Sequence, residues 1–121
     1  MKTIREIKVW VKAIDFVTKL YKKTETFPQT EMYGLTSQMR RSAISIPSNI
    51  AEGFGRKTQK EFKRFLQISM GSLFELQTQL EISKNLKYLN DTDFNEIFDG
   101  EVTYSYKYIV EIKGDAENGF R

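Results

Sequence analysis

The sequence predicts an all-α protein, folded as an antiparallel up-down-up-down four-helix bundle. Apolar residues recur every three or four positions along four segments, the links between these segments are short, and no stretch alternates like a β-strand. The 121 residues have the length of one domain. We assign residues 1–113 to the bundle and residues 114–121, which are polar and hold two glycines, to a flexible C-terminal tail.

The first helix is predicted from about Ile7 to Lys23. It should end before Phe27-Pro28, because the residue before a proline disfavours the helical region. Charged residues occupy the positions between its apolar stripe, as in an amphipathic helix. The stripe consists of Trp10, Ala13, Ile14, Val17, Leu20 and Tyr21.

The second helix is predicted from about Leu35 to Phe54, with a proline inside it. Pro47 removes a backbone donor and crowds the preceding turn, yet the apolar register continues from Ile46 to Ile50. We therefore expect a kink at Pro47 within a helix that does not break. The side chains expected to supply compensating hydrogen bonds are Ser45, Ser48 and Asn49.

The link between the second and third helices carries clear end signals. Gly53 and Gly55 close the second helix, as helix C-termini prefer. Thr58 and Glu61 match a capping box, with a hydroxyl first and a carboxylate three residues later. The third helix then holds a near-heptad apolar seam to about Leu86.

Asn90 and Asp93 cap the predicted fourth helix, whose apolar stripe runs from Phe94 to Ile112. Gly100 interrupts this stripe. Because glycine costs about 1 kcal/mol relative to alanine inside a helix, Gly100 marks either a bend or a close contact.

The aromatic residues exceed what one small core needs. Several fall partly outside the predicted seams, and large exposed apolar patches rarely persist on monomers. We expect some of them to contact a second subunit. They are Tyr21, Tyr33, Phe54, Phe74, Tyr88, Tyr104 and Tyr106.

Cysteine and histidine are both absent. Their absence excludes disulfides, thiolate nucleophiles, zinc-finger sites and imidazole acid–base catalysis. Glu96 and Asp99 share a helix face, but a carboxylate metal site needs a second pair on a facing helix, and Glu75 and Glu81 are poorly spaced for it. We therefore predict no catalytic residue, no metal ligand and no cofactor: the protein is not an enzyme.

No apolar run approaches the ~20 residues that a membrane-spanning helix needs. The first residues mix lysine, arginine and glutamate with isoleucine and lack the apolar core of a secretory signal. We expect a cytoplasmic protein without a membrane partner.

The net charge of +3 is unevenly distributed. Residues 1–64 hold fourteen Lys/Arg against six Asp/Glu, a balance of +8, whereas residues 65–121 hold five against ten, a balance of −5. Such asymmetry suggests a basic surface for a polyanion or an acidic partner. The alternative is that helices of opposite charge neutralise each other within the monomer or between subunits.

Several motifs resemble one known family. The central match is Ser45-Ile46-Pro47-Ser48-Asn49-Ile50-Ala51-Glu52-Gly53, preceded by residues 33–41 and followed by residues 55–56, 60–62, 65–66, 71–73 and 75–80. Residues 9–10 and the turn at 86–89 also match. On these residues the chain resembles the bacterial four-helix-bundle family encoded within 23S rRNA intervening sequences. The fourth helix and the tail match only by pattern.

The resemblance implies a compact bundle that assembles into a ring, typically a homopentamer. It also implies a relative, the accessory variability determinant of diversity-generating retroelements, a basic pentameric bundle that binds a reverse transcriptase and nucleic acid. The partners it implies are further copies of this chain, RNA or DNA, and a reverse transcriptase or other protein. For the intervening-sequence branch itself, the family supplies no established activity.

A basic cluster is the best candidate binding site; we define it as Arg56, Lys57, Lys60, Lys63 and Arg64. Positions 56, 60, 63 and 64 share one helical face. Repeated around a ring, this face would form a cationic belt suited to phosphate contacts, which need charge but no sequence code. The alternative is a solvated helix face that pairs with acidic residues of a neighbour.

Arg40 and Arg41 are adjacent and therefore point in different directions on a helix. One should face inward beside a carboxylate, for which Glu52 and Glu75 are the candidates. We add Arg40 to the nucleic-acid candidates. The predicted structural motif consists of Arg41, Pro47, Asn49, Glu52, Gly53, Gly55 and Glu75.

Two function classes stay open. The first is a non-enzymatic, nucleic-acid-associated oligomeric scaffold encoded in a 23S rRNA intervening sequence or a similar element. The second is an interaction module that binds only protein.

Overall fold

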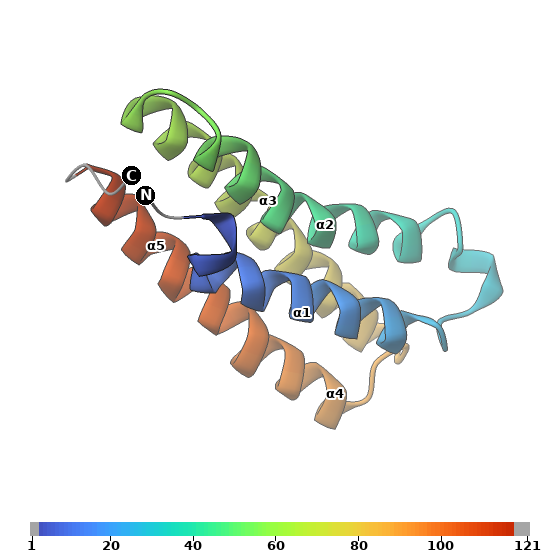
Figure 1. Cartoon of the computed structure of the whole chain (residues 1–121). Coiled ribbons are helices and arrows are strands. Elements are labelled where there is room, and N and C mark those ends of the chain that lie inside the picture. Colours follow the sequence, from blue (N-terminus) through green and yellow to red (C-terminus); the bar gives the residue numbers. More distant parts are fainter. Residues whose placement is uncertain (1–2, 118–121) are drawn as a thin grey trace.

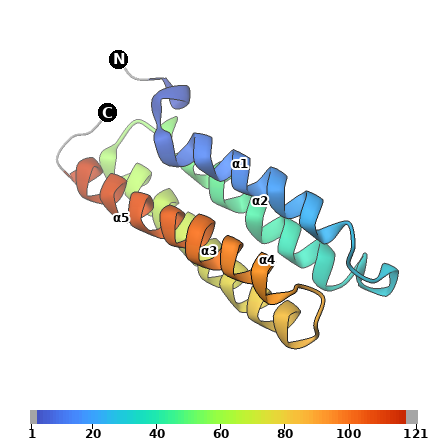
Figure 2. The same ribbon diagram turned by 90° about the horizontal axis from the view of Figure 1, so that it is seen from below.

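The computed structural model describes residues 3–117, in which four long helical stretches lie side by side without any β-strand (Figures 1 and 2). The all-α prediction is therefore confirmed. The elements are α1 (Lys8–Thr24), α2 (Leu35–Phe54), α3 (Gln59–Asn85), α4 (Asp91–Asn95), a π-helical segment (Glu96–Val102) and α5 (Thr103–Glu117). Among these residues, no helix is both long and apolar enough to cross a membrane.

One apolar core runs along the bundle, and every long helix contributes to it. Burying a large apolar side chain completely stabilises the fold by about 1.5–3 kcal/mol before the entropy cost of ordering it. The largest fully buried side chains are Ile7, Phe16, Leu20, Met39, Ile46, Ile50, Phe62, Leu66, Leu73, Leu76, Leu80 and Ile109.

The buried face of α1 differs from the predicted stripe. Val9 and Phe16, which the prediction omitted, are 1 % and 0 % exposed, whereas Ile14, which it included, is 39 % exposed. Apolar residues spread over more than one face of this helix, so two different lines of residues have helical spacing. The packing of α1 against its neighbours selects one of them. The half-buried residues on its flank are Trp10, Val17 and Tyr21.

Helix α2 continues through the buried Pro47 without a break, as predicted. Asn49 forms hydrogen bonds in this turn: its Nδ2 donates to the carbonyl oxygen and to Oγ of Ser45, both at 2.8 Å. The carbonyl that lacks its helical donor because of Pro47 is instead that of Ala43. A further bond comes from α3, where Ser69 Oγ donates to the carbonyl oxygen of Ile46 at 2.9 Å. The turn around the proline is thus stabilised from its own helix and from its neighbour.

Small residues line the contact between α2 and α3; we call Ser42, Ser45, Gly53, Ser69 and Ser72 the α2–α3 seam. The hydroxyl oxygens of Ser45 and Ser72 lie 2.7 Å apart across it. Small side chains allow two helices to approach closely, and these hydroxyls satisfy one another where they leave water.

Gly53 is the closest point of this seam. A Cβ atom placed on it would lie 2.6 Å from Phe65 Cβ and 3.0 Å from Phe62 Cδ1. Gly53 is therefore needed for packing and lies one residue before the end of α2, whereas Gly55 is the C-cap residue of this helix, as predicted. Gly55, directly after α2, has a right-handed backbone with φ of −79°.

Two ion pairs join α1 to the last helical stretch. Lys19 Nζ lies 2.7 Å from Glu101 Oε1, and Lys23 Nζ lies 2.7 Å from Asp93 Oδ1. In each case the hydrogen bond to the carboxylate raises the pKa of the lysine. Both pairs connect the basic half of the sequence to the acidic half, so part of the charge asymmetry is neutralised within the monomer.

The predicted fourth helix contains a π-helical segment around Gly100. A Cβ on Gly100 would meet no heavy atom within 4 Å, so of the two predicted alternatives, a bend or a close contact, the close contact is excluded. Thr103 Oγ1 donates to the carbonyl oxygen of Phe98 at 3.1 Å, which supports the widened turn. At the other end, α5 extends to Glu117, four residues into the predicted tail; residues 118–121 lie outside the described part.

We predict that Gly53→Ala lowers the free energy of unfolding by about 1–3 kcal/mol, because overpacking forces the two helix backbones apart. Urea denaturation followed by circular dichroism measures the change. The matched control is Gly71→Ala on α3, where a Cβ would meet nothing within 4 Å. This control should gain about 0.5–1 kcal/mol from helix propensity. Equal stability of the two variants would contradict the proposed role of Gly53.

Candidate nucleic-acid interface

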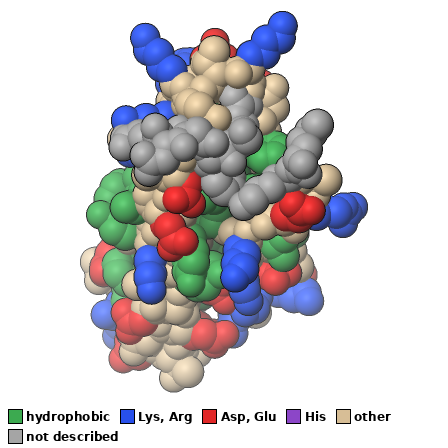
Figure 3. Space-filling model, turned by 60° about the vertical axis from the view of Figure 1, so that its left-hand side comes forward, with side chains coloured by type: hydrophobic (Ala, Val, Ile, Leu, Met, Phe, Trp, Pro, Cys, Tyr) green, Lys and Arg blue, Asp and Glu red, His purple; other side chains and the backbone are tan. Residues whose placement is uncertain are grey.

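The five residues of the basic cluster are all exposed, and they lie at the α2–α3 connection and the first turns of α3. Thr58 fixes the start of α3, because its side-chain oxygen accepts from the backbone N–H of Glu61 at 3.1 Å. Figure 3 shows Lys and Arg side chains projecting from this end of the molecule, which also carries both chain ends in Figure 1. Lys60, Lys63 and Arg64 lie on α3, whereas Arg56 and Lys57 lie in the connection before it, so the prediction that Arg56 shares their helical face is wrong.

The two arginines of the cluster share one aromatic neighbour. The guanidinium carbons of Arg56 and Arg64 lie 4.8 and 4.9 Å from the ring centroid of Phe65. Arg56 Nη2 also lies 2.7 Å from Glu52 Oε1, one helical turn earlier. Among the side chains of residues 3–115, no carboxylate forms an ion pair with Arg64.

An open hollow of about 660 Å³ lies along the cluster. Lys113 of α5 reaches its edge and donates a hydrogen bond to Gln67 Oε1. Lys113 is a sixth cation at this site that sequence reasoning missed, because 46 residues separate it from Gln67 and no local pattern connects them. The residues that line the hollow are Thr58, Lys60, Glu61, Lys63, Arg64 and Gln67.

The comparison with known families decides where this bundle belongs. The family model described as 23S rRNA-intervening sequence protein matches residues 5–105. The chain belongs to the 23S rRNA-intervening sequence protein family. The matched range contains α1, α2, α3, the seam and the whole basic cluster. The comparison with curated proteins found no match.

In this family member Arg40 is held against α1. Its Nε donates to Thr24 Oγ1 at 3.0 Å, its Nη2 donates to the carbonyl oxygen of Tyr21 at 3.1 Å, and its guanidinium carbon lies 4.5 Å from the Tyr21 ring. These bonds supply donors to a carbonyl and a hydroxyl oxygen in the last turn of α1, where the helix dipole also favours a cation. The inward arginine is therefore Arg40, and Arg41 is the exposed one.

The two carboxylates expected beside the inward arginine bond elsewhere. Glu52 pairs with Arg56, and Glu75 Oε1 accepts from Ser42 Oγ at 3.0 Å. A carbonyl and a hydroxyl on α1 take their place as acceptors for Arg40. Glu75 thus contributes to the α2–α3 contact rather than to an arginine pair.

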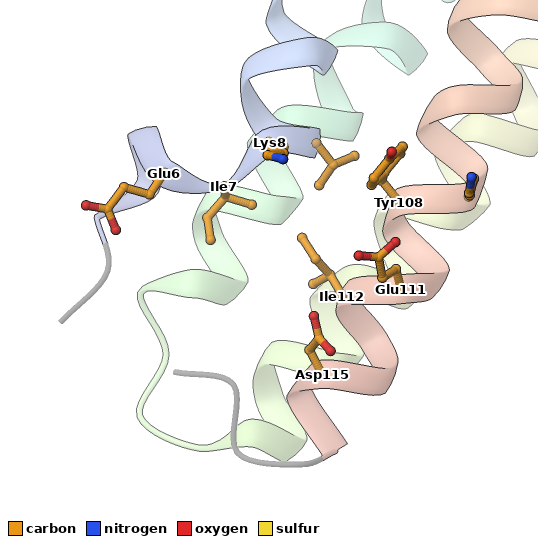
Figure 4. Close-up of a pocket in the computed structure, with 9 residues that line it drawn as sticks. Glu6, Ile7, Lys8, Tyr108, Glu111, Ile112 and Asp115 are labelled. Atoms are coloured by element: carbon orange, nitrogen blue, oxygen red, sulfur yellow. The ribbon is translucent and has the colours of Figure 1, made fainter.

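A second hollow, of about 360 Å³, lies between the start of the chain and α5 (Figure 4). Glu111 and Asp115 point toward it, while Glu6 points away in this view. Lys8 and Lys107 also line it, so charges of both signs meet there. In residues 3–117 no buried polar atom without a partner belongs to its lining, and we assign it no ligand.

Across the described residues, no three His, Cys, Asp or Glu side chains come together in a group that could hold a metal ion. Ser45, beside the proline, is engaged with Ser72 and Asn49. The groups available for binding at the basic cluster are therefore exposed cations, which suit an anionic ligand.

We predict that Arg40→Ala lowers the free energy of unfolding by about 1.5–3 kcal/mol, the range for hydrogen bonds to a charged group. Arg41→Ala is the matched control: it removes the same charge from an exposed side chain and should change stability by less than about 0.5 kcal/mol. Urea denaturation measures both. If the two variants unfolded at the same denaturant concentration, the assignment of Arg40 to α1 would be wrong.

Proposed function

We propose that this chain is a non-enzymatic, oligomeric bundle protein that binds nucleic acid without sequence preference through the basic cluster. The observation that carries the proposal is the gathering of five exposed cations at one end of the molecule. RNA and DNA are both candidate ligands, because each presents the same phosphate charge.

The charge around the cluster supports phosphate as the ligand. Among the carboxylates that the structure describes, in residues 3–115, none forms an ion pair with Lys57, Lys60 or Arg64. Cations that are not neutralised by the protein can release counterions from a nucleic-acid backbone, which is the main source of non-specific affinity. Phosphate contacts position a protein on nucleic acid but carry no sequence information.

We predict that affinity for RNA or DNA falls steeply with salt, with a log–log slope of about −0.9 for each phosphate neutralised on duplex DNA. Reversing Lys60, Lys63 and Arg64 to glutamate should abolish binding while circular dichroism stays unchanged. Changing the base sequence of the probe should matter little. Gel shifts at a series of salt concentrations measure these effects.

The control for this experiment reverses Lys8, Lys12 and Lys22, three exposed lysines of α1. It changes the net charge by the same amount and should retain most of the binding. A gel shift at ~50 mM salt with no complex for either RNA or DNA would favour the protein-only interaction module.

We further infer an antiparallel up-down-up-down order of the helices and a closed homo-oligomeric ring, most simply a pentamer. Phe74 of α3 and Tyr106 of α5 are 50 % and 45 % exposed, and their ring centroids lie 6.0 Å apart. Val110 on α5 is 47 % exposed. Closed cyclic assemblies bury such patches on every subunit without an open end.

The other aromatic residues of the predicted surplus divide into two groups. Tyr33 is 96 % exposed and remains a candidate for contact with another copy. The half-buried ones have partners within the chain: Tyr21 lies under Arg40, and Tyr88 donates to Glu31 Oε2 at 3.0 Å. Phe54 and Tyr104 are also half-buried. The α3–α5 patch is therefore the surface on which we base the ring; a reverse transcriptase stays a candidate partner from the resemblance alone.

We predict that Phe74→Glu dissociates the ring without unfolding the helices, because a charge placed in an apolar interface is desolvated without a partner. Light scattering should report a multiple of the 14.2 kDa chain mass for the unmodified protein and that mass alone for the variant. Thr92→Glu, an exposed position at the start of α4, is the control and should leave the oligomer intact. A stable monomer of the unmodified protein at micromolar concentration would rule out the ring.

A further inference from the structure

The ring of Phe65 is contacted by two arginines from different elements. Arg56 comes from the α2–α3 connection and Arg64 from the second turn of α3, yet both guanidinium carbons lie within 5 Å of the same ring centroid. Phe65 is 8 % exposed, and both arginines lie over its ring. At such distances a cation is attracted to an aromatic ring.

This arrangement makes the two arginines different from the lysines of the cluster. A guanidinium is planar and presents its N–H donors as a fork, which matches the oxygens of a phosphate in two parallel hydrogen bonds. Held over an aromatic ring, the fork is already oriented, so less side-chain entropy is lost when it binds. The lysines at positions 57, 60 and 63 supply point charges around it.

Glu52 occupies one donor of this pair in the structure. Its Oε1 lies 2.7 Å from Arg56 Nη2, and both side chains are well exposed, at 57 % and 42 %. An exposed ion pair of this kind contributes little to stability. A phosphate oxygen accepts from the same donor as a carboxylate oxygen, so Glu52 can be exchanged for a ligand at low cost.

We propose that Arg56 and Arg64, positioned by Phe65, form a clamp for one phosphodiester group of a nucleic acid, with Glu52 as its internal competitor. The clamp rests on the proposed nucleic-acid function and adds to it a defined contact within the basic cluster. The remaining cations supply the long-range attraction, and the clamp supplies the short-range hydrogen bonds.

The test compares substitutions that keep the charge. Arg64→Lys retains the cation but loses the fork, and it should weaken binding of a short fluorescent oligonucleotide about tenfold, the effect of one charge-assisted hydrogen bond. The salt slope should stay unchanged, because the number of charges is the same. The control Lys60→Arg, a charge-preserving exchange outside the clamp, should change the affinity less than about twofold. Anisotropy at ~50 mM salt measures both.

A second comparison tests whether Glu52 competes with the phosphate for Arg56. Glu52→Gln should tighten binding more than Glu61→Gln, although each removes one negative charge beside the cluster. Glutamine is also accepted at the capping position of residue 61, so the start of α3 is kept. Equal tightening by both variants would mean that only net charge matters, and Glu52 would then be no competitor.

The source of the phosphate is tested with oligonucleotides that carry either a 5′-hydroxyl or a 5′-phosphate. Equal affinity supports a backbone phosphodiester, whereas an Arg64-dependent preference for the 5′-phosphate overturns that assignment. If charge reversal of the cluster abolishes binding but Arg64→Lys behaves like Lys60→Arg, the clamp is wrong and the proposed function stands. If the unmodified chain binds neither RNA nor DNA, both are wrong.

Discussion

The close approach of α2 to α3 is the constraint on which the rest of this structure depends. At Gly53 the two helices come so near that one added carbon would collide with Phe65. Further along, the hydroxyls of Ser45 and Ser72 meet directly, and Ser69 reaches across to a backbone carbonyl. Small side chains set the distance, and hydroxyls satisfy the polar groups that lose water there. The path of α3 away from its connection to α2 is fixed by these contacts.

Phe65 connects that packing to the charged surface. Its Cβ faces Gly53, and its ring carries the guanidinium groups of Arg56 and Arg64. A shift of this side chain therefore moves both arginines as well as the helix contact. The helix packing and the positions of the two arginines therefore cannot change independently here. A substitution in the α2–α3 seam should also change the geometry of the basic cluster. The segment from Ser45 to Gly53 thus influences a surface that lies beyond it.

The helices could be predicted because their signals are local. Apolar spacing and end signals such as the Thr58 capping box placed the bounds of α2 and α3 within a residue or two. The π-helical segment was missed, although the buried Ile97 and Val102 are five positions apart, which is the spacing of a single widened turn. An analysis that looks only for apolar residues three or four positions apart does not detect this five-residue spacing. The partial error on α1, where Ala13 and Leu20 are buried as predicted but Ile14 is exposed, has a similar cause, since two lines of apolar residues fit one period.

The candidate site shows where local signals end. Spacing indicates which face of a helix a side chain occupies, but not which neighbour lies beyond it. Arg40 therefore counted as a free cation until its partners on α1, 16 and 19 residues away, were known. The charge balance along the sequence also fails to show which charges are paired. Lys19 and Lys23 count toward the positive charge of residues 1–64, yet each pairs with a carboxylate of residues 65–121. What points to a polyanion is thus the position of the basic cluster, and not the sum of charges.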